Sequence, residues 1–209
     1  VLVAGTGPRQ LWLGYLSAVL AGGVPALLPI RPGLDRPHEI QRRLATARRA
    51  VPDGLLLVGT TAGGAPCIEP DPGDWTALEE PAEGCTRPAG AAVEELLDRL
   101  VPGPDSPLHL QLTSGSTGEA KPVVVTHGNV MANIRDIIER AQFTADDVSL
   151  SWMPLTHDMG LIGFHLCMLA AGIEHTIMDT RLFSRRPLLW LKEASDQGAT
   201  LLSSPNFGY

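Results

Sequence analysis

The stretch Leu112-Thr113-Ser114-Gly115-Ser116-Thr117-Gly118-Glu119-Ala120-Lys121 decides which fold this sequence predicts. It begins at the end of an expected strand over 108–112 and contains six consecutive glycine or small hydroxyl residues, with Lys121 three positions past the last glycine. Glycine lets a backbone adopt positive φ and approach a ligand closely, so that freed amides and hydroxyls surround an anion. Lysine adds a point charge. The stretch therefore predicts a loop that holds the phosphates of a nucleotide.

A flexible surface loop is the alternative for this stretch, because serine, threonine and glycine cluster in many loops that bind nothing. The strand before it, the lysine at its end and the apolar run 123–125 after it favour the phosphate loop. The spacing G-x-x-x-x-G-K-[ST] of a Walker A loop is absent, and so is the dinucleotide fingerprint G-x-G-x-x-G. The sequence therefore indicates another class of nucleotide-binding loop.

Apolar strands and amphipathic helices alternate on both sides of this loop, which predicts an α/β fold of layered sheets with flanking helices and some parallel pairing. After the loop we expect helices over 127–142, 161–171 and 187–197, and strands over 123–125, 148–152, 173–178 and 200–203. Before it we expect helices over 9–21, 38–50 and 91–100, strands over 24–30 and 55–58, and surface loop with short strand pieces over 60–89. We divide the chain into a first α/β subdomain over 1–106 and a second, carrying the loop, over 107–209.

Composition excludes several classes of protein. The net charge is -7 without a basic tract, so we expect no nucleic-acid partner. No apolar run reaches the roughly 20 residues that span a bilayer. Three scattered cysteines argue against a disulfide framework and favour a reducing, cytoplasmic location. Val1 lies in an apolar run and Tyr209 ends the chain without a closing element, so we expect an N-terminally truncated first subdomain and a C-terminally truncated second one.

A second motif is Trp152-Met153-Pro154-Leu155-Thr156-His157-Asp158-Met159-Gly160-Leu161-Ile162-Gly163, at the junction of an expected strand and helix. Thr156 or Asp158 is a candidate cap for that helix. A histidine at such a junction either points into a cleft or has a structural, capping role. The phosphate loop upstream favours the cleft for His157. His157 and His165 have no third ligand at metal spacing, so we expect no metal site, and Cys167 lies in an apolar helix typical of a core.

The loop, the following Thr126-His127-Gly128-Asn129-Val130 and the second motif together resemble the adenylate-forming superfamily. The segments 182–191 and 204–209 also resemble its fatty acyl-AMP ligases, and most closely the acid-activating loading domains of hybrid polyketide/peptide synthetases. The resemblance is strong over 108–209 and weaker before. One departure is visible, because the family usually has glycine after the loop lysine and this chain has Pro122. A proline there predicts a less mobile loop.

This resemblance implies part of an ATP-dependent enzyme that adenylates a carboxylic or fatty acid, with Mg²⁺ as cofactor, and loads an acyl carrier protein. The residues it assigns to the ATP phosphates are Thr113, Ser114, Gly115, Ser116, Thr117, Gly118 and Lys121. Those it assigns to the acyl and adenylate pocket are His157, Asp158, Met159, Gly160, Ser204, Pro205 and Asn206. It implies no catalytic residue within 1–209, since the family's adenine motif, Mg²⁺-binding glutamate, ribose-binding aspartate and catalytic lysine are expected in a missing C-terminal portion. We therefore expect no turnover by these residues alone.

Two alternatives stay open at this point. One is a non-catalytic, adenylation-like docking or scaffold module, which Pro122 and the truncation favour and the intact loop opposes. The other is an acyl-CoA synthetase fragment, which differs in transferring the acyl group to coenzyme A. The sequence does not identify the acid.

Overall fold

Strands of the chain form three sheets within the residues that the computed structural model describes, which are 1–30, 35–61, 65–70, 75–78, 94–95, 101–113 and 121–208. These residues separate into two compact units, Val1–Gly128 and Asn129–Tyr209. Each unit is described by itself. Residues 94–95 of the expected helix over 91–100 are helical, and its other residues lie outside the described residues, as do residues 114–120 of the expected loop.

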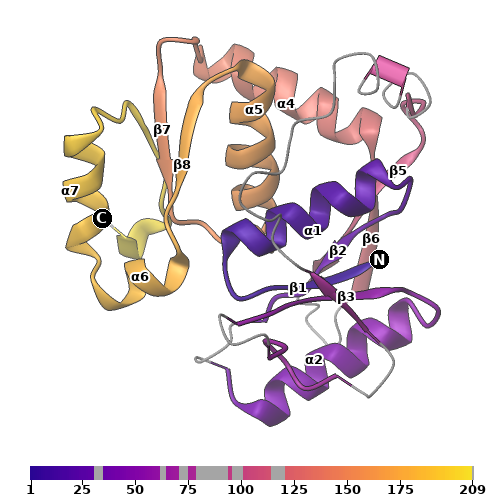
Figure 1. Ribbon diagram of the computed structural model, residues 1–209. Coiled ribbons are helices and arrows are strands. Elements are labelled where there is room, and N and C mark those ends of the chain that lie inside the picture. The colour runs from indigo at the N-terminus through magenta and orange to yellow at the C-terminus, as the bar shows by residue number, and fades with distance from the viewer. Residues whose placement is uncertain are drawn as a thin grey trace. The chain divides into compact units, whose positions relative to one another are not determined.

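The first unit opens with a parallel sheet in the strand order β2-β1-β3-β4. Figure 1 shows α1 above this sheet and α2 below it. The elements are β1 (Leu2–Ala4), α1 (Pro8–Leu20), β2 (Ala26–Leu27), α2 (Pro37–Ala50), β3 (Leu56–Gly59) and β4 (Thr76–Leu78).

Alternation along β1 assigns its residues to the two faces of the sheet. Leu2 and Ala4 belong to a buried cluster that includes Leu44 and Ala47 of α2. Val3, between them, faces α1, where Gly14 lies so close that an added Cβ would stand 2.5 Å from Val3 Cγ1. Because side chains alternate across a strand, the three-residue β1 is fully buried between two helices.

A β-hairpin completes the first unit. It consists of β5 (Pro107–Thr113) and β6 (Lys121–Thr126), which pair antiparallel, and β5 also lies beside β2, where the Leu110 N–H donates to the Pro25 carbonyl at 2.9 Å. This contact joins the hairpin to the parallel sheet. In sequence, the first unit ends at Gly128, beyond the subdomain boundary expected at 106/107. That subdomain division stays a prediction for the protein as a whole.

The second unit contains a parallel sheet in the order β8-β7-β9. Figure 1 shows α5 on one side of β7 and β8 and the pair α6 and α7 on the other. The elements that follow β6 are α4 (His127–Ala141), β7 (Val148–Ser151), the π-helix η1 (Met159–Leu166), α5 (Cys167–Ala171), β8 (Glu174–Ile177), α6 (Thr180–Arg185), α7 (Leu188–Asp196), β9 (Leu201–Leu202) and the short 3₁₀ helix η2 (Asn206–Gly208).

Aromatic residues fill the core between this sheet and α6–α7. Trp152 stacks on Phe183 with ring centroids 3.8 Å apart, and the fully buried Trp190 meets both rings edge-on. Leu150 of β7 and Ala194 of α7 belong to the same cluster. Cys167 is also fully buried, as its apolar surroundings predicted.

The fold class is confirmed as α/β, with parallel sheets and flanking helices. Three elements differ from expectation. The strand over 24–30 is shortened to Ala26–Leu27, the helix over 161–171 begins as the π-helix η1, and α6 was not expected. Within the described part of the chain, no helix is long and apolar enough to cross a membrane.

Candidate functional site

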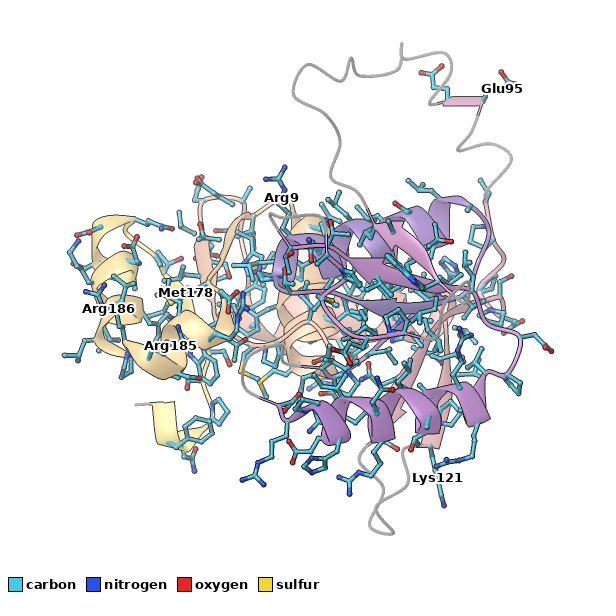
Figure 2. All side chains as sticks on the ribbon, turned by 60° about the horizontal axis from the view of Figure 1, so that its bottom comes forward. Arg9, Glu95, Lys121, Met178, Arg185 and Arg186 are labelled. Carbon is cyan, nitrogen blue, oxygen red and sulfur yellow. The ribbon has the colours of Figure 1, made fainter. Side chains whose placement is uncertain are left out.

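The two ends of the predicted phosphate loop are held together by the hairpin. Thr113 and Lys121 are the last register pair of β5 and β6, and the Thr113 hydroxyl donates to the Lys121 carbonyl at 3.2 Å. Both residues are exposed, and Figure 2 shows the Lys121 side chain extending away from the strands. The predicted loop residues Ser114, Gly115, Ser116, Thr117 and Gly118 lie outside the described residues. The loop thus starts and closes at two neighbouring strand ends.

Pro122 occupies a position in β6 where a backbone N–H is not needed for pairing with β5. The Leu110 N–H points to the carbonyl of Pro25, directly before β2, and therefore away from β6. The direction of the backbone N–H alternates along a strand, so the Leu112 N–H also points away from β6. Leu112 and its partner Pro122 therefore form a non-hydrogen-bonded pair. Proline is tolerated at such outward-facing positions of an edge strand. The departure from glycine therefore costs no hydrogen bond of this ladder.

We expect Pro122→Gly to lower the free energy of unfolding by about 1 kcal/mol or less, a shift of a few degrees in melting temperature. The variant gains flexibility in the unfolded chain and recovers no hydrogen bond to β5. Thermal denaturation followed by circular dichroism checks this. A more stable variant would show that the proline strains the hairpin.

The predicted pocket residues gather at one edge of the sheet β8-β7-β9. All three strands are parallel, so the residues that follow them lie at the same carboxyl edge, where ligands of open α/β sheets bind. His157, Asp158, Met159 and Gly160 follow β7, and Ser204, Pro205 and Asn206 follow β9. The Ser203 hydroxyl lies 3.7 Å from the Met159 sulfur, which joins the two groups directly.

His157 and Asp158 form a polar pair at the start of η1. The His157 Nδ1 lies 2.7 Å from Asp158 Oδ1, and the Met159 N–H donates to Asp158 Oδ1 at 2.7 Å and faces His157 Nδ1 at 3.2 Å. Asp158 thus stands at the N-cap position, as one of the two residues considered for that role. His157 takes part in the same capping arrangement, while 56% of its side chain stays exposed to solvent. The imidazole is therefore both structurally engaged and accessible.

Gly160 is required by the path of the backbone. A Cβ at this position would lie 2.2 Å from the Pro154 carbonyl oxygen and 3.0 Å from that of Met153. The Pro154 carbonyl also accepts the His157 N–H at 3.0 Å, closing the turn that carries the histidine. The first turn of η1 therefore lies directly on the turn 154–157, and only glycine allows this approach.

The π-helix that follows is unusual in itself. The Cys167 N–H reaches the Ile162 carbonyl, five residues back, where an α-helix would use the residue four back. π-Helical turns occur frequently at functional sites. Here the eight residues of η1 lead from the exposed His157–Asp158 pair to the buried Cys167.

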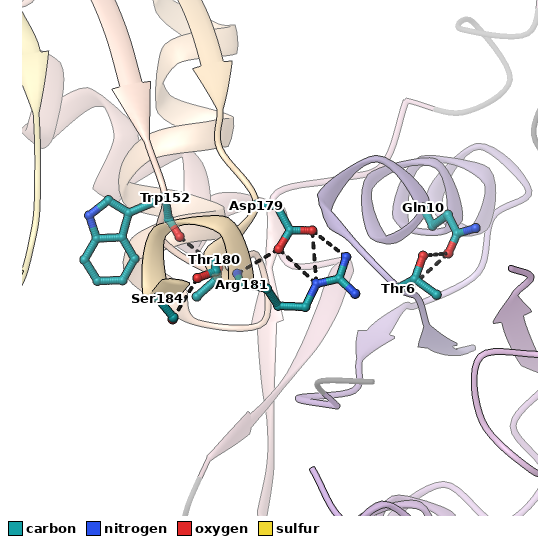
Figure 3. Close-up of polar contacts among 7 residues, drawn as sticks. All are labelled: Thr6, Gln10, Trp152, Asp179, Thr180, Arg181 and Ser184. Carbon is teal, nitrogen blue, oxygen red and sulfur yellow. Dashed lines mark hydrogen bonds and ion pairs between the residues drawn. The ribbon is translucent and has the colours of Figure 1, made fainter. Parts of the chain in front are cut away.

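A further ion pair lies at the same edge, after β8. Asp179 accepts the Arg181 N–H at 2.8 Å and binds the Arg181 guanidinium, with Nη2 2.6 Å from Oδ2 (Figure 3). Burial raises the pKa of the Asp179 carboxyl, but the hydrogen bonds and charge of Arg181 outweigh it, and the pKa lies below its usual value. The Thr180 hydroxyl donates to the Trp152 carbonyl at 2.8 Å, which fixes α6 to the end of β7. Sequence reasoning missed this pair, although an aspartate directly before a short helix is a capping signal.

Two half-buried histidines, His165 of η1 and His175 of β8, lie close together. His175 of β8 contacts the Ser149 hydroxyl at 3.0 Å, and the rings of His165 and His175 have centroids 5.5 Å apart. Burial lowers the pKa of each histidine from 6.5 to about 4, and the charge of His175 adds to the lowering at His165. Both are therefore neutral in the folded protein at pH 7. Within the described residues, no three histidine, cysteine or acidic side chains come together as a metal site.

We expect the protein to lose stability as the pH falls from about 6.5 to about 4. Folding lowers the pKa of His165 and His175, so the unfolded chain takes up more protons than the folded one in this pH range. The stabilisation from the two neutral histidines is therefore complete only above pH 6.5. Melting temperatures at a series of pH values check this. The variant His165→Phe/His175→Phe should flatten the dependence, whereas His38→Gln on the exposed face of α2 should not. A pH profile unchanged by the double substitution would contradict the account.

Comparison with known proteins identifies the family. The sequence profile of the AMP-binding enzymes matches residues 17–206, which include both strands of the hairpin and the whole carboxyl edge described above. The chain belongs to the AMP-binding enzyme family. The resemblance to the adenylate-forming superfamily, drawn from the loop and the second motif, is thereby confirmed.

Several proteins similar to this AMP-binding chain are named as fatty-acid ligases. The long-chain-fatty-acid–AMP ligase FadD26 of Mycobacterium marinum is 30% identical across 94% of the chain, which matches 34% of that protein. The medium-chain-fatty-acid–[acyl-carrier-protein] ligase TtuA of Teredinibacter turnerae is 43% identical across 51% of the chain and 16% of its own length. The crystal structure of a fatty acid AMP ligase from Legionella pneumophila superposes on the whole chain with a TM-score of 0.74 and 26% identity, using 35% of its own chain. The chain thus spans about a third or less of these proteins.

Proposed function

We propose that this chain is part of an enzyme that activates a carboxylic or fatty acid as its adenylate with ATP and passes the acyl group to an acyl carrier protein. The observation that carries the proposal is the hairpin, which brings Thr113 and Lys121 together at the two ends of a glycine-rich loop in an AMP-binding chain. The chain has two lysines, Lys121 and Lys192. Lys121 supplies an exposed ammonium group at this site, whereas Lys192 lies on α7 and pairs with Asp196.

In the first step, a carboxylate oxygen of the acid attacks the α-phosphorus of ATP. The bond to the bridging oxygen breaks and pyrophosphate leaves, so the product is a mixed anhydride of the acid and AMP. Negative charge accumulates on the transferring and leaving groups, and fixed donors and a cation lower the cost of that charge. We assign this role to residues 113–118 and to Lys121. The described residues offer no set of metal ligands, so no step is assigned to the Mg²⁺ on which the family's chemistry depends.

We assign the acyl and adenylate pocket to the carboxyl edge of β8-β7-β9. His157 and Asp158 supply exposed polar groups there, and Ser204, Pro205 and Asn206 follow the neighbouring strand β9. The contact between Ser203 and Met159 supports a common surface formed by both segments.

In the second step, the thiol of a phosphopantetheine arm attacks the acyl carbon. The bond to the AMP oxygen breaks, a thioester forms, AMP leaves and the thiol proton passes to solvent. The name of TtuA, a ligase acting on a carrier protein, supports this acceptor, whereas a relative from Caulobacter vibrioides, 42% identical across 58% of the chain, is named as an acyl-CoA synthetase and supports the coenzyme A alternative. Pro122 favours the scaffold alternative in the sequence, but it costs no hydrogen bond of the β5–β6 ladder and therefore does not weigh against an enzyme.

ATP–pyrophosphate exchange against a panel of carboxylic acids tests the first step. We would compare these 209 residues with a longer form that carries the downstream segments expected from the family. Exchange only in the longer form would support the proposal and identify the acid. Exchange by the 209 residues alone would show that the downstream groups are not required. No exchange by either form would support the scaffold alternative.

A further inference from the structure

The segment that joins α6 to α7 is exposed over five consecutive residues, from Ser184 to Leu188. We propose that the surface formed by Arg185, Arg186, Leu188 and Leu191, called here the α6–α7 face, docks an acidic surface of the acceptor carrier protein. The inference rests on the proposed function and adds to it the place where the acceptor binds.

The apolar part of the α6–α7 face has no cover within the described residues. Leu188 is 78% exposed and Leu191 is 51% exposed, and their i, i+3 spacing places them on one side of α7. The opposite side of the same helix is buried through Trp190 and Ala194. Helix α7 is therefore held firmly in the aromatic core while it presents two leucines outward, as expected of a helix that contacts a partner.

The charge of the face differs from that of the chain as a whole. Arg185 and Arg186 are both exposed, and the part of the chain that the structure describes supplies neither with an ion pair. The neighbouring cations are neutralised, since Arg181 binds Asp179 and Lys192 binds Asp196. With a net charge of -7 on the chain, two uncompensated arginines beside exposed leucines select a partner with acidic groups around an apolar centre.

A carrier protein fits this face better than an anionic membrane does. Lipid surfaces are typically bound by clusters of about four to eight basic residues, and this face has two arginines. The net charge of -7 also opposes approach to an anionic bilayer. A protein partner needs only local charge complementarity and a small apolar contact.

The position of the face suits an acceptor of the acyl group. Helix α6 begins directly after Asp179, at the carboxyl edge of the sheet, and is fixed there by the hydrogen bond from Thr180 to the Trp152 carbonyl. Figure 2 labels Arg185, the last residue of α6, Arg186, which follows it, and Met178, which follows β8. A protein bound to the α6–α7 face would therefore sit on the same unit as the proposed acyl pocket.

The test is the charge reversal R185E/R186E in the complete enzyme, with a holo acyl carrier protein of acidic surface as the probe. We expect KM for the carrier protein to rise at least about tenfold, with weaker dependence on salt, while ATP–pyrophosphate exchange is unchanged. The matched control is R135E/R140E, which reverses two exposed arginines of α4 and should leave KM within about twofold. Replacing acidic residues of the carrier protein by amides should weaken transfer by the wild-type enzyme and have less effect on the R185E/R186E variant.

Three outcomes would overturn the inference. An equal loss in both double variants would show a general effect of net charge. A loss of pyrophosphate exchange in R185E/R186E would show a structural role for the arginines. Binding to vesicles of anionic phospholipid that requires Arg185 and Arg186, with carrier-protein transfer unaffected by their reversal, would assign the face to a membrane. Absence of exchange in the wild-type enzyme with every acid would instead contradict the proposed function.

Discussion

Gly160→Ala should lower the free energy of unfolding by about 3 kcal/mol or more, a fall on the order of 10 °C in melting temperature. The new Cβ would lie 2.2 Å from the Pro154 carbonyl oxygen, and a second carbonyl, that of Met153, blocks it at 3.0 Å. Both obstacles are backbone atoms, so no side-chain rotation relieves the clash. The turn that carries His157 has to move, and we therefore expect acid adenylation by the complete enzyme to fall with stability.

Gly163→Ala is the matched control, in the same π-helix. There an added Cβ would meet only the Met159 side chain, at an ordinary contact distance of 3.8 Å. Since alanine restricts the unfolded chain more than glycine does, this variant should be neutral or more stable by up to about 1 kcal/mol. Thermal denaturation of both variants decides the matter. Equal effects at the two positions would contradict the close approach of η1 to the turn 154–157.

Lys121→Ala should reduce kcat/KM for ATP in pyrophosphate exchange by about 10²-fold. Lys121 is exposed at the end of β6, where the predicted phosphate loop closes, and it supplies the positive charge that the proposed reaction requires. Because its side chain makes no ion pair within the described residues, removing it should leave the melting temperature nearly unchanged. Lys121→Arg keeps the charge and should retain more activity than alanine.

Lys192→Ala provides the control, because Lys121 and Lys192 are the two lysines of the chain. Lys192 is exposed on α7, where it pairs with Asp196, and solvent screens surface pairs of this kind so that they contribute little to stability. We expect full activity from this variant. A loss of activity in Lys192→Ala equal to that in Lys121→Ala would argue against a specific phosphate contact.

The alternation of strands and helices could be predicted because each element follows a strong local rule. Helix α1 begins at Pro8, and α2 has a polar face, with Leu44 and Ala47 buried at a spacing of three. The strands β1 and β3 are short apolar runs, and β7 alternates apolar residues with serine. These signals depend only on residues near in sequence, and the structure reproduces them within a few residues.

Features that depend on distant contacts were not predictable from the same signals. The π-helix η1 differs from an α-helix by one residue in its hydrogen bonding, which leaves no trace in the hydrophobic pattern. The tolerance of Pro122 follows from the direction of the Leu110 N–H toward Pro25, and no local rule reveals that direction. Helix α6 has only six residues, too few for a clear period, although its capping aspartate was a usable signal.

The candidate site was predictable in part for a similar reason. Parallel strands bring His157 and Ser204 to one edge although 47 positions separate them in the numbering (204 minus 157), and the alternation of elements already implied such an edge. Asp179 could have been predicted as a helix cap, but its place at this edge could not, because that depends on how α6 attaches to β7 through Thr180.

The most direct test of acid adenylation is the fate of a labelled oxygen. The complete enzyme would be given ATP, the acid that supports exchange and a carrier protein, with both carboxylate oxygens of the acid replaced by ¹⁸O. Attack of the carboxylate on the α-phosphorus predicts that AMP leaves with one ¹⁸O atom, detected as a gain of two mass units. AMP without the label, or ADP in its place, would contradict the account.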